Sequence, residues 1–288
     1  MSVDALLLPD PLASEPLPRT SAEGYLDRGL YDFALVARLL DWADDPALAP
    51  AERATFLAFS AVALDPIVAR GATAGDGAHD GFRETVRELA VRQQTAHGHL
   101  VGSLAEHGIR IVGWSALTRR LRAEVRERYR KEVFPLVMPQ ASSPAHPFPR
   151  VSSLSLNLLL AYRAGPQRPL EFARIKVPRG RSLSRFLAVP STPDVLVPVE
   201  TVIAGNLDLL LPGAAVEACA AFRPTRGHRP GSPCPSPIVR LEVDDAMPDA
   251  LRAALAHVLH VDGRQPLETG GFLGVEDWET VADTLPRR

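Results

Sequence analysis

The chain has 288 residues, of which 46% are hydrophobic, so it can form two domains of ordinary size with real cores. Its 32 basic and 34 acidic side chains give a net charge of -2, which excludes a bulk attraction to nucleic acid or to an anionic membrane. The two cysteines, Cys219 and Cys234, form neither a disulfide framework nor a metal-binding pattern. We therefore predict a cytoplasmic protein, and no membrane span because the apolar runs are too short.

The first part of the chain carries helix signals. Residues 1–22 contain many prolines and no periodic pattern, which predicts a flexible tail. The next two runs, YDFALVARLL and AERATFLAFSAVAL, carry apolar residues at helical spacing. After the glycine-rich stretch GATAGDGAHDG, a long amphipathic run continues to His107-Gly108, which is a helix-stop signal. The three runs predict a helical domain over residues 23–108.

The second part mixes strand and helix patterns. Ser115 is the predicted N-cap of a charged helix that continues to about Lys131. Four later runs have strand composition between prolines and glycines: VSSLSLNLLLAYR, EFARIKVP, RFLAVP and IVRLEVD. Two runs have helix signals: PVETVIAGNLDLLLPG and AMPDALRAALAHVLHVDG. We therefore predict an α+β fold, in which the helical bundle is followed by a mixed α/β domain over residues 109–288 with a mostly antiparallel sheet.

The usual motifs of catalysis are missing: the sequence has no P-loop, no glycine-rich dinucleotide turn after a strand, no HExxH, no CxxC and no nucleophile elbow. His257 and His260 are three apart near a helix end; a metal site would need further ligands, and a helix-end or surface role is the alternative. The Asp244-Asp245 pair suggests acid and base chemistry, but neighbours on a strand point to opposite faces, so solvated residues are the simpler interpretation. From the residues alone we predict no catalytic, cofactor-binding or metal-binding residue.

Two basic features leave alternatives open. Arg119, Arg122, Arg126 and Arg130 recur at helical intervals in RRLRAEVRERYRK, as a phosphate-binding stripe would. Glutamates interleave with them, so an exposed helix with i,i+3 and i,i+4 ion pairs explains the same residues. His146 lies between prolines in SPAHPFPR, where a turn residue is the structural interpretation and chemistry the alternative.

Several stretches, in order, resemble the amino-terminal and middle domains of bacterial polyphosphate kinase. The opening helices resemble the first domain of that family, and the similarity is closer in EHGIRIV, EVFPLVMPQASSPAHPFPRVSSLSLNL, FARIKVP, RFLAVP, VPVETVIAGNLDLLLPG, FRPTR and VRLEVDDAMPDALRAAL. The resemblance extends from about Tyr25 to Gly263. It implies an enzyme family that moves the terminal phosphate of ATP reversibly onto polyphosphate. It also implies a structural role for His146, because the phosphorylated histidine of the family lies in later domains.

The resemblance also implies which parts are missing. In the family, two carboxy-terminal domains carry the phosphorylated histidine and most contacts to phosphate, metal and nucleotide, and we expect this chain to stop before them. Ala63 stands where the resemblance implies an asparagine that contacts ATP, and Pro66 stands at the usual glutamate. Asp32 replaces the tryptophan of the opening motif, and a proline-rich loop from Pro224 to Pro237 replaces a helical insertion. We therefore expect no cofactor.

The expected function follows from these departures. The resemblance implies a truncated polyphosphate-kinase-like protein that is unable alone to transfer phosphate from ATP to polyphosphate. We expect it to act as an assembly or regulatory partner in polyphosphate metabolism, as a homo-oligomer or in association with a full-length polyphosphate kinase. Polyphosphate binding is left open, and no nucleic-acid partner is expected. Two alternatives remain: a fragment or split half of an active polyphosphate kinase, and a non-functional relic.

Overall fold

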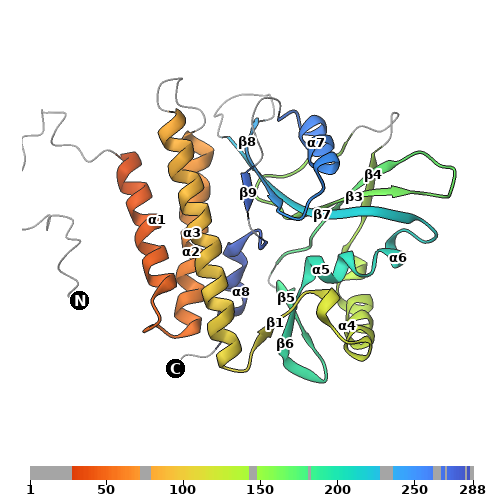
Figure 1. The fold of residues 1–288 in the computed structure, drawn as a ribbon, viewed down its shortest axis with the longest axis horizontal. Coiled ribbons are helices and arrows are strands. Elements are labelled where there is room, and N and C mark those ends of the chain that lie inside the picture. Colours follow the sequence, from red (N-terminus) through yellow and green to blue (C-terminus); the bar gives the residue numbers. More distant parts are fainter. Residues whose placement is uncertain are drawn as a thin grey trace, which may run out of the picture.

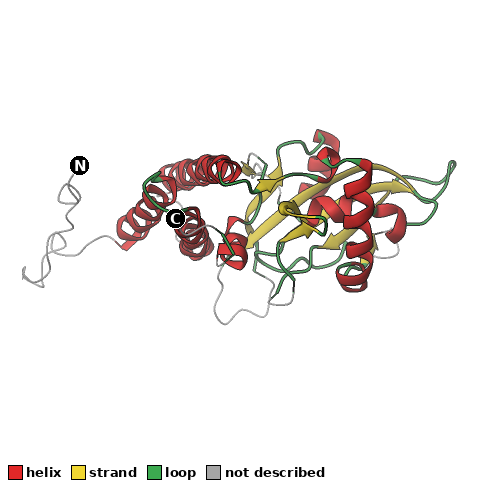
Figure 2. Cartoon of the chain, turned by 90° about the horizontal axis from the view of Figure 1, so that it is seen from below, coloured by secondary structure: helices red, strands yellow, loops and turns green. Residues whose placement is uncertain are grey.

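A helical layer lies beside an α/β part in the computed structural model (Figure 1). Viewed at 90° to this, the helices form an arc next to the sheet (Figure 2). The structure describes residues 28–71, 79–142, 148–180, 183–227, 236–261, 267–269, 271–282 and 284–285. The predicted tail over residues 1–22, His146, Cys234 and most of the predicted proline-rich loop lie outside the described residues.

The helical layer contains α1 (Arg28–Asp44), α2 (Pro50–Gly71) and α3 (His79–Glu106). Proline suits the first turn of α2, and the carboxylate of Glu52 accepts a hydrogen bond from the Ala49 amide at 3.0 Å, which caps the helix. The apolar stripes that predict these helices face one another, and their buried residues include Val36, Leu40, Ala54, Leu57, Leu64, Leu100 and Leu104. No helix among the described residues is long and apolar enough to cross a membrane.

The connection to the second part passes through β1 (Arg110–Ile111), η3 (Trp114–Ala116), α4 (Arg119–Glu132) and η4 (Phe134–Leu136). The predicted cap of α4 at Ser115 is wrong. Ser115 lies within the 3-10 turn η3, which ends in extended backbone at Leu117, so the helix begins later. Its cap is Thr118, whose hydroxyl accepts a hydrogen bond from the Leu121 amide at 3.4 Å.

The main sheet has six strands and is mostly antiparallel, as predicted. Its spatial order is β2 (Pro139–Ser142), β4 (Glu171–Lys176), β3 (Asn157–Arg163), β7 (Ala215–Arg226), β8 (Ile238–Asp244) and β9 (Leu267–Thr269). Only the pairing of β8 with β9 is parallel among these described strands. A smaller sheet contains β1, β6 (Thr192–Pro198) and β5 (Phe186–Val189), in that order, with β1 and β6 parallel. The α+β fold is therefore confirmed.

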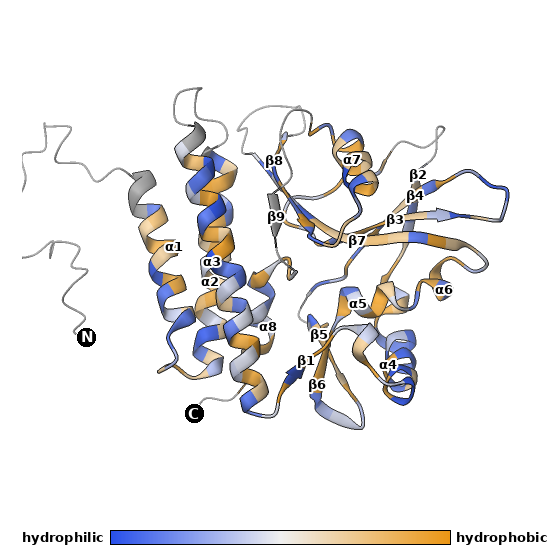
Figure 3. Cartoon of the chain, viewed as in Figure 1, coloured by the Kyte–Doolittle hydropathy of each residue, from blue (hydrophilic) through white to orange (hydrophobic). Residues whose placement is uncertain are grey.

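Helices cover both faces of the main sheet, which explains why the run NLLLAYR is apolar without alternation. Leu158 and Leu160 of β3 share a core with α4 and α5 (Val199–Ala204), whereas Leu159 packs with α7 (Asp249–Val258) on the other face. In Figure 3, hydrophobic residues follow β3 and β7 through this central layer, while α4 is largely hydrophilic.

The single helix predicted from PVETVIAGNLDLLLPG is two short helices, α5 and α6 (Leu207–Leu210). Gly205 lies at the break, and only glycine fits there, because a Cβ atom would lie 2.3 Å from the ring of Trp114. The Asn206 carboxamide then donates to the Val202 carbonyl at 2.7 Å and accepts from Arg126 at 2.8 Å, which fixes the turn. Trp114 therefore links the connecting segment to this helix pair.

The segment over residues 271–285 returns to the helical layer. It contains η5 (Val275–Trp278) and α8 (Glu279–Ala282), and its buried side chains join the core of the three long helices. Trp278 is fully buried, and its indole nitrogen donates to His97 Nδ1 at 3.0 Å. The predicted boundary between residues 108 and 109 therefore separates segments that share one core.

Candidate functional site

Nine charged residues meet where the helical layer contacts the sheet. We call this set the charged junction. Its members come from α2, β7, β8, α5, η5 and the loop before β5, and they are Asp65, Arg179, Arg185, Glu200, Arg223, Arg240, Glu242, Glu276 and Asp277.

Arg223 lies at the centre of the charged junction, with its side chain 2% exposed. It stands opposite Glu242 in the β7–β8 register and donates to that carboxylate at 2.6 Å. It also donates to Glu276 at 2.9 Å and pairs with Asp65 of α2. Arg240, two residues from Glu242 and on the same face of β8, pairs with the same aspartate. Two strand arginines thus hold one helix carboxylate.

A second set of pairs extends the charged junction toward η5. The Arg185 side chain is 1% exposed, pairs with Glu200 and with Asp277 at 2.5 Å each, and lies 4.6 Å from the ring centre of Phe272. Arg179 pairs with Glu276 at 2.8 Å and with Asp277 at 2.5 Å. All four arginines therefore hold carboxylates of the chain itself.

The electrostatics of the charged junction favour its charged state. Burial would raise the pKa of Glu276, but Arg223 and Arg179 outweigh burial and lower it to about 2. Glu276 Oε2 is buried and has no hydrogen-bond partner in the described part of the chain. Beside the junction, burial and then Arg185 lower the pKa of His97 to about 4, so the ring is neutral and can accept from Trp278. The arrangement ties segments together rather than presenting free cations to a phosphate.

Ala63 lies on α2, two residues before the charged junction. Its side chain is partly buried against the core of the helical layer, and a methyl group offers no hydrogen bond. Pro66 is exposed within the same helix, and Asp32 pairs with Arg70 at 2.8 Å. That Ala63 occupies a nucleotide-contacting position stays a prediction.

The arginines of α4 are mostly engaged in local contacts. Arg126 pairs with Asp208, and Arg122 donates to the Trp114 carbonyl at 3.2 Å and to the Ser115 carbonyl at 2.5 Å. Three i,i+4 ion pairs lie along the same helix, Arg120–Glu124, Arg128–Glu132 and Lys131–Glu127. These contacts favour the interpretation as an ion-paired helix over a phosphate-binding stripe.

The histidine pair and the aspartate pair singled out from the sequence lie at a helix end and in a turn. His260 follows α7 with a φ of 54°, in the left-handed region of a helix C-terminus, and His257 is exposed. Asp244 accepts the Ala246 amide at 2.9 Å in a turn, while Asp245 is exposed. Among the residues that were described, no group of three or more histidine, cysteine or acidic side chains could hold a metal ion.

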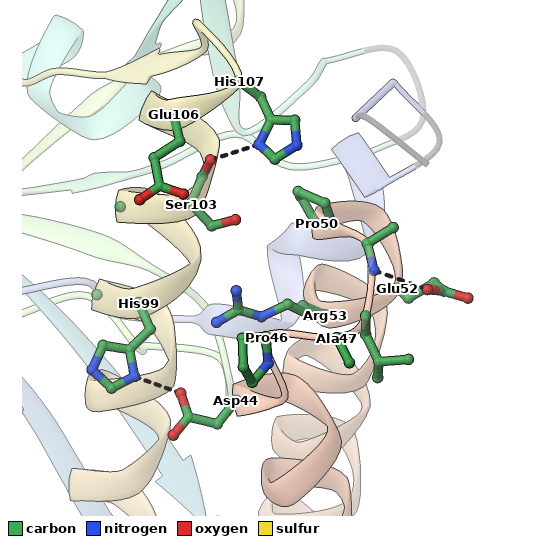
Figure 4. Close-up of a pocket in the computed structure, with 14 residues that line it drawn as sticks. Asp44, Pro46, Ala47, Pro50, Glu52, Arg53, His99, Ser103, Glu106 and His107 are labelled. Carbon is green, nitrogen blue, oxygen red and sulfur yellow. Dashed lines mark hydrogen bonds and ion pairs between the residues drawn. The ribbon is translucent and has the colours of Figure 1, made fainter. Parts of the chain in front are cut away.

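An open pocket lies at the opposite end of α2 from the charged junction. It is formed by residues 44–53, where α1 turns into α2, and by residues 98–107, at and just beyond the end of α3, and it has a volume of about 830 Å³. Figure 4 shows the guanidinium of Arg53 between the two walls, with His99 and Ser103 on the side of α3. We call it the turn pocket; no sequence motif indicates it.

Comparisons with known proteins first identify the class of domain to which part of this chain belongs. Residues 120–228 match the family model described as the polyphosphate kinase middle domain. The chain is 33% identical over 324 residues to the polyphosphate kinase of Mycolicibacterium gilvum, covering 96% of this chain and 43% of that protein. It is 38% identical over 223 residues to the polyphosphate kinase of Streptomyces coelicolor, covering 71% and 29% respectively.

A solved structure agrees. The polyphosphate kinase of Porphyromonas gingivalis superposes with a TM-score of 0.73 at 21% identity, covering 92% of this chain and 42% of that chain, which shows a shared fold. The chain belongs to the polyphosphate kinase family. It spans less than half the length of these relatives.

Sequence reasoning missed the charged junction and the role of residues 271–285. A signal for the junction is present in IVRLEVD, where charged Arg240 and Glu242 alternate with apolar residues of a strand that is buried on both faces. Such alternation indicates one charged face, but the partner Asp65 lies 175 residues away from Arg240, and no local pattern identifies it.

Proposed function

We propose that this chain acts in polyphosphate metabolism as an assembly or regulatory partner and does not by itself transfer phosphate from ATP to polyphosphate. The proposal concerns polyphosphate because the chain is related to polyphosphate kinases, and the observation that carries it is the engaged state of the buried arginines. The charged junction supports it, because its arginines are held by carboxylates of the chain, whereas phosphoryl transfer needs cations directed at phosphate.

Exposed apolar side chains supply surfaces for assembly. Leu35 and Trp42 of α1 and Phe59 and Val62 of α2 are each more than a third exposed. A second group lies at the start of the sheet, with Met138 75% exposed. Large apolar residues gathered on a surface mark interaction sites, and a stable interface buries on the order of 1,200–2,000 Å² in total. A homodimer or a complex with a full-length polyphosphate kinase would cover them.

The decisive experiment measures activity and assembly on one preparation. The purified chain is expected neither to form polyphosphate from ATP nor to form ATP from polyphosphate. Light scattering is expected to show a dimer, or a pull-down with purified full-length polyphosphate kinase to show a complex. The double variant Phe59→Ser, Val62→Ser should weaken that association, while Arg87→Ser, at an exposed ion pair on α3, should not. Turnover by the chain alone, or a monomer that captures no kinase at tens of micromolar, would overturn the proposal.

We propose weak or absent ATP binding for the same chain. The support is Ala63, which offers no side-chain hydrogen bond at the position that the family resemblance assigns to an ATP-contacting asparagine. One lost hydrogen bond costs about 0.5–1.5 kcal/mol net, and most other nucleotide contacts of the family belong to later domains. Titration calorimetry with ATP tests this directly, and a submillimolar dissociation constant would contradict it.

A split enzyme is the second candidate, because the chain is 33% identical, over 96% of its own length, to the polyphosphate kinase of Mycolicibacterium gilvum. In that case a separate chain would supply the remaining part. Mixing this protein with a polyphosphate kinase fragment that lacks its first two domains should then restore polyphosphate synthesis. A mixture that stays inactive while the chain still forms a dimer would favour the assembly role instead. If the chain is a monomer and is inactive both alone and in the mixture, the non-functional relic is the remaining interpretation.

A further inference from the structure

The turn pocket contains a buried cation that the fold does not neutralise. Arg53 is 5% exposed, and its Nε atom donates to the Ala43 carbonyl at 2.9 Å. Its two Nη groups have no hydrogen-bond partner or ion pair within the described part of the chain. Figure 4 shows these groups directed across the pocket toward α3. Because the Nη groups face the open pocket and have no counterion there, they are available to an anion from solution.

The carboxylates around the turn pocket do not fill this role. Asp44 pairs with His99 Nδ1 at 2.5 Å, and Glu52 accepts the Ala49 amide. Glu106 lies in the wall but makes no ion pair with Arg53 in the described part of the chain. The acids next to the pocket are therefore engaged elsewhere or stay apart from the guanidinium.

The wall on α3 is open because it contains two glycines one turn apart. Gly98 and Gly102 line the turn pocket, and a Cβ atom built at either would meet no heavy atom within 4 Å. Glycine in a helix interior destabilises the helix relative to alanine. Here no close packing requires it, and its effect is to leave space beside Arg53.

We propose that the turn pocket binds a small molecule through a carboxylate or phosphate group. The Nη groups of Arg53 would hold two of its oxygens in the bidentate geometry that guanidinium favours. Ser103 offers a hydroxyl from α3. His107 donates from Nδ1 to the Ser103 carbonyl at 2.8 Å, so Nε2 of the neutral ring is an acceptor, suited to a donor group of the ligand rather than to its anionic oxygens. A volume of about 830 Å³ admits more than the anionic group alone. This proposal is independent of the proposed function.

The test titrates the full chain separately with acetate and with inorganic phosphate, at constant ionic strength, and follows amide shifts of residues 98–107 by NMR. Saturable shifts with either anion are expected: acetate alone identifies a carboxylate ligand, phosphate alone a phosphate ligand, and both a general oxyanion site. Arg53→Gln should weaken binding roughly tenfold or more, because it removes a charged hydrogen-bond donor. Glu106→Gln should strengthen it, because it removes a nearby negative charge.

A second variant tests the pocket independently, in case Arg53→Gln fails to fold. Gly102→Leu leaves Arg53 in place but fills the space beside it, and it should also abolish binding. Gly81→Ala is the matched control, because Gly81 lies in the same helix far from the pocket and a Cβ there also meets nothing within 4 Å. Shifts that neither anion saturates, or equal affinity in wild type and Gly102→Leu, would overturn the proposal.

Discussion

At the scale of single residues, Arg223 shows what buried charge does in this chain. Its guanidinium binds carboxylates from three elements, Asp65, Glu242 and Glu276, and is 2% exposed. Replacing a whole buried ion-pair network by apolar side chains often costs little stability, whereas removing one member leaves its partners buried with fewer counterions. The main effect of the charged junction is therefore to specify which segments of the chain contact one another, and its net contribution to stability is smaller.

Removal of Arg223 is expected to be strongly destabilising. Arg223→Met should lower the free energy of unfolding by about 3–5 kcal/mol, because three buried carboxylates lose the central partner that they share and keep only Arg240 or Arg179. Arg120→Met is the control, since Arg120 is 69% exposed and pairs only on the surface; it should cost at most about 1 kcal/mol. Urea unfolding of both variants measures the difference. Equal losses would refute a structural role for the charged junction.

The pKa of Glu276 predicts acid sensitivity. Folding lowers this pKa from 4.5 to about 2, so the unfolded chain takes up the proton first as the pH falls. The stabilisation by ionised Glu276 is therefore complete above about pH 4.5 and is lost as the pH falls toward 2. The difference in unfolding free energy between wild type and Glu276→Gln should shrink over this range. Urea unfolding at several pH values would show a constant difference if the prediction were wrong.

At the scale of elements, the beginning of α4 and residues 271–285 depend on contacts that lie outside each element. Trp114, in the turn just before α4, lies against Gly205 between α5 and α6. Trp278 reaches α3 and donates to His97. Each element is therefore positioned by a tryptophan that inserts into another part of the chain.

The cap of α4 can be tested by substitution. Thr118→Ala should lower the free energy of unfolding by about 1 kcal/mol, because the hydroxyl accepts the Leu121 amide. Ser115→Ala should have a smaller effect, since the Ser115 side chain makes no cap contact in the described structure. Thermal unfolding of the two variants compares them. A larger loss for Ser115→Ala would restore the cap predicted from the sequence.

Loss of Trp278 should weaken the helical layer. Trp278→Ala removes a fully buried ring and is expected to cost about 3–5 kcal/mol. Trp42→Ala is the matched control on α1, where the ring is 37% exposed, and it should cost less. Hydrogen exchange of the α3 amides would show increased opening only in the first variant. Unchanged protection in Trp278→Ala would mean that the helices do not need residues 271–285.

At the scale of the whole molecule, the two parts are expected to unfold together. The charged junction joins α2 to the sheet, and residues 271–285 complete the helical core. Amide resonances of α2, in the helical layer, and of β3, in the second part, give local probes that need no substitution. Coincident urea midpoints are expected. Separate midpoints would show two independent domains and support a boundary at residue 108.

The sequence predicts what is periodic and misses what depends on distant contacts. Apolar spacing identifies α1, α2 and α3, and strand composition identifies β3, β4 and β8, because these signals are local. The cap at Thr118 is a local contact with Leu121, so pattern alone does not separate it from Ser115, whereas the glycine at the Gly205 break and the partners of Asp65 depend on side chains from elsewhere. Arg53 gives no local sign of its pocket, since burial of a charge without a partner follows from packing of the turn against α3.

The contact between Trp278 and His97 also affects synthesis of the chain. The two residues are 181 positions apart, so at about 5–20 residues per second the ribosome makes the tryptophan roughly 10–40 s after the histidine. During that interval the three long helices have left the ribosome, and the apolar surface that Trp278 later covers is exposed. A nascent chain stalled before residue 271 should therefore bind a hydrophobic chaperone more strongly than one stalled after release of residue 285.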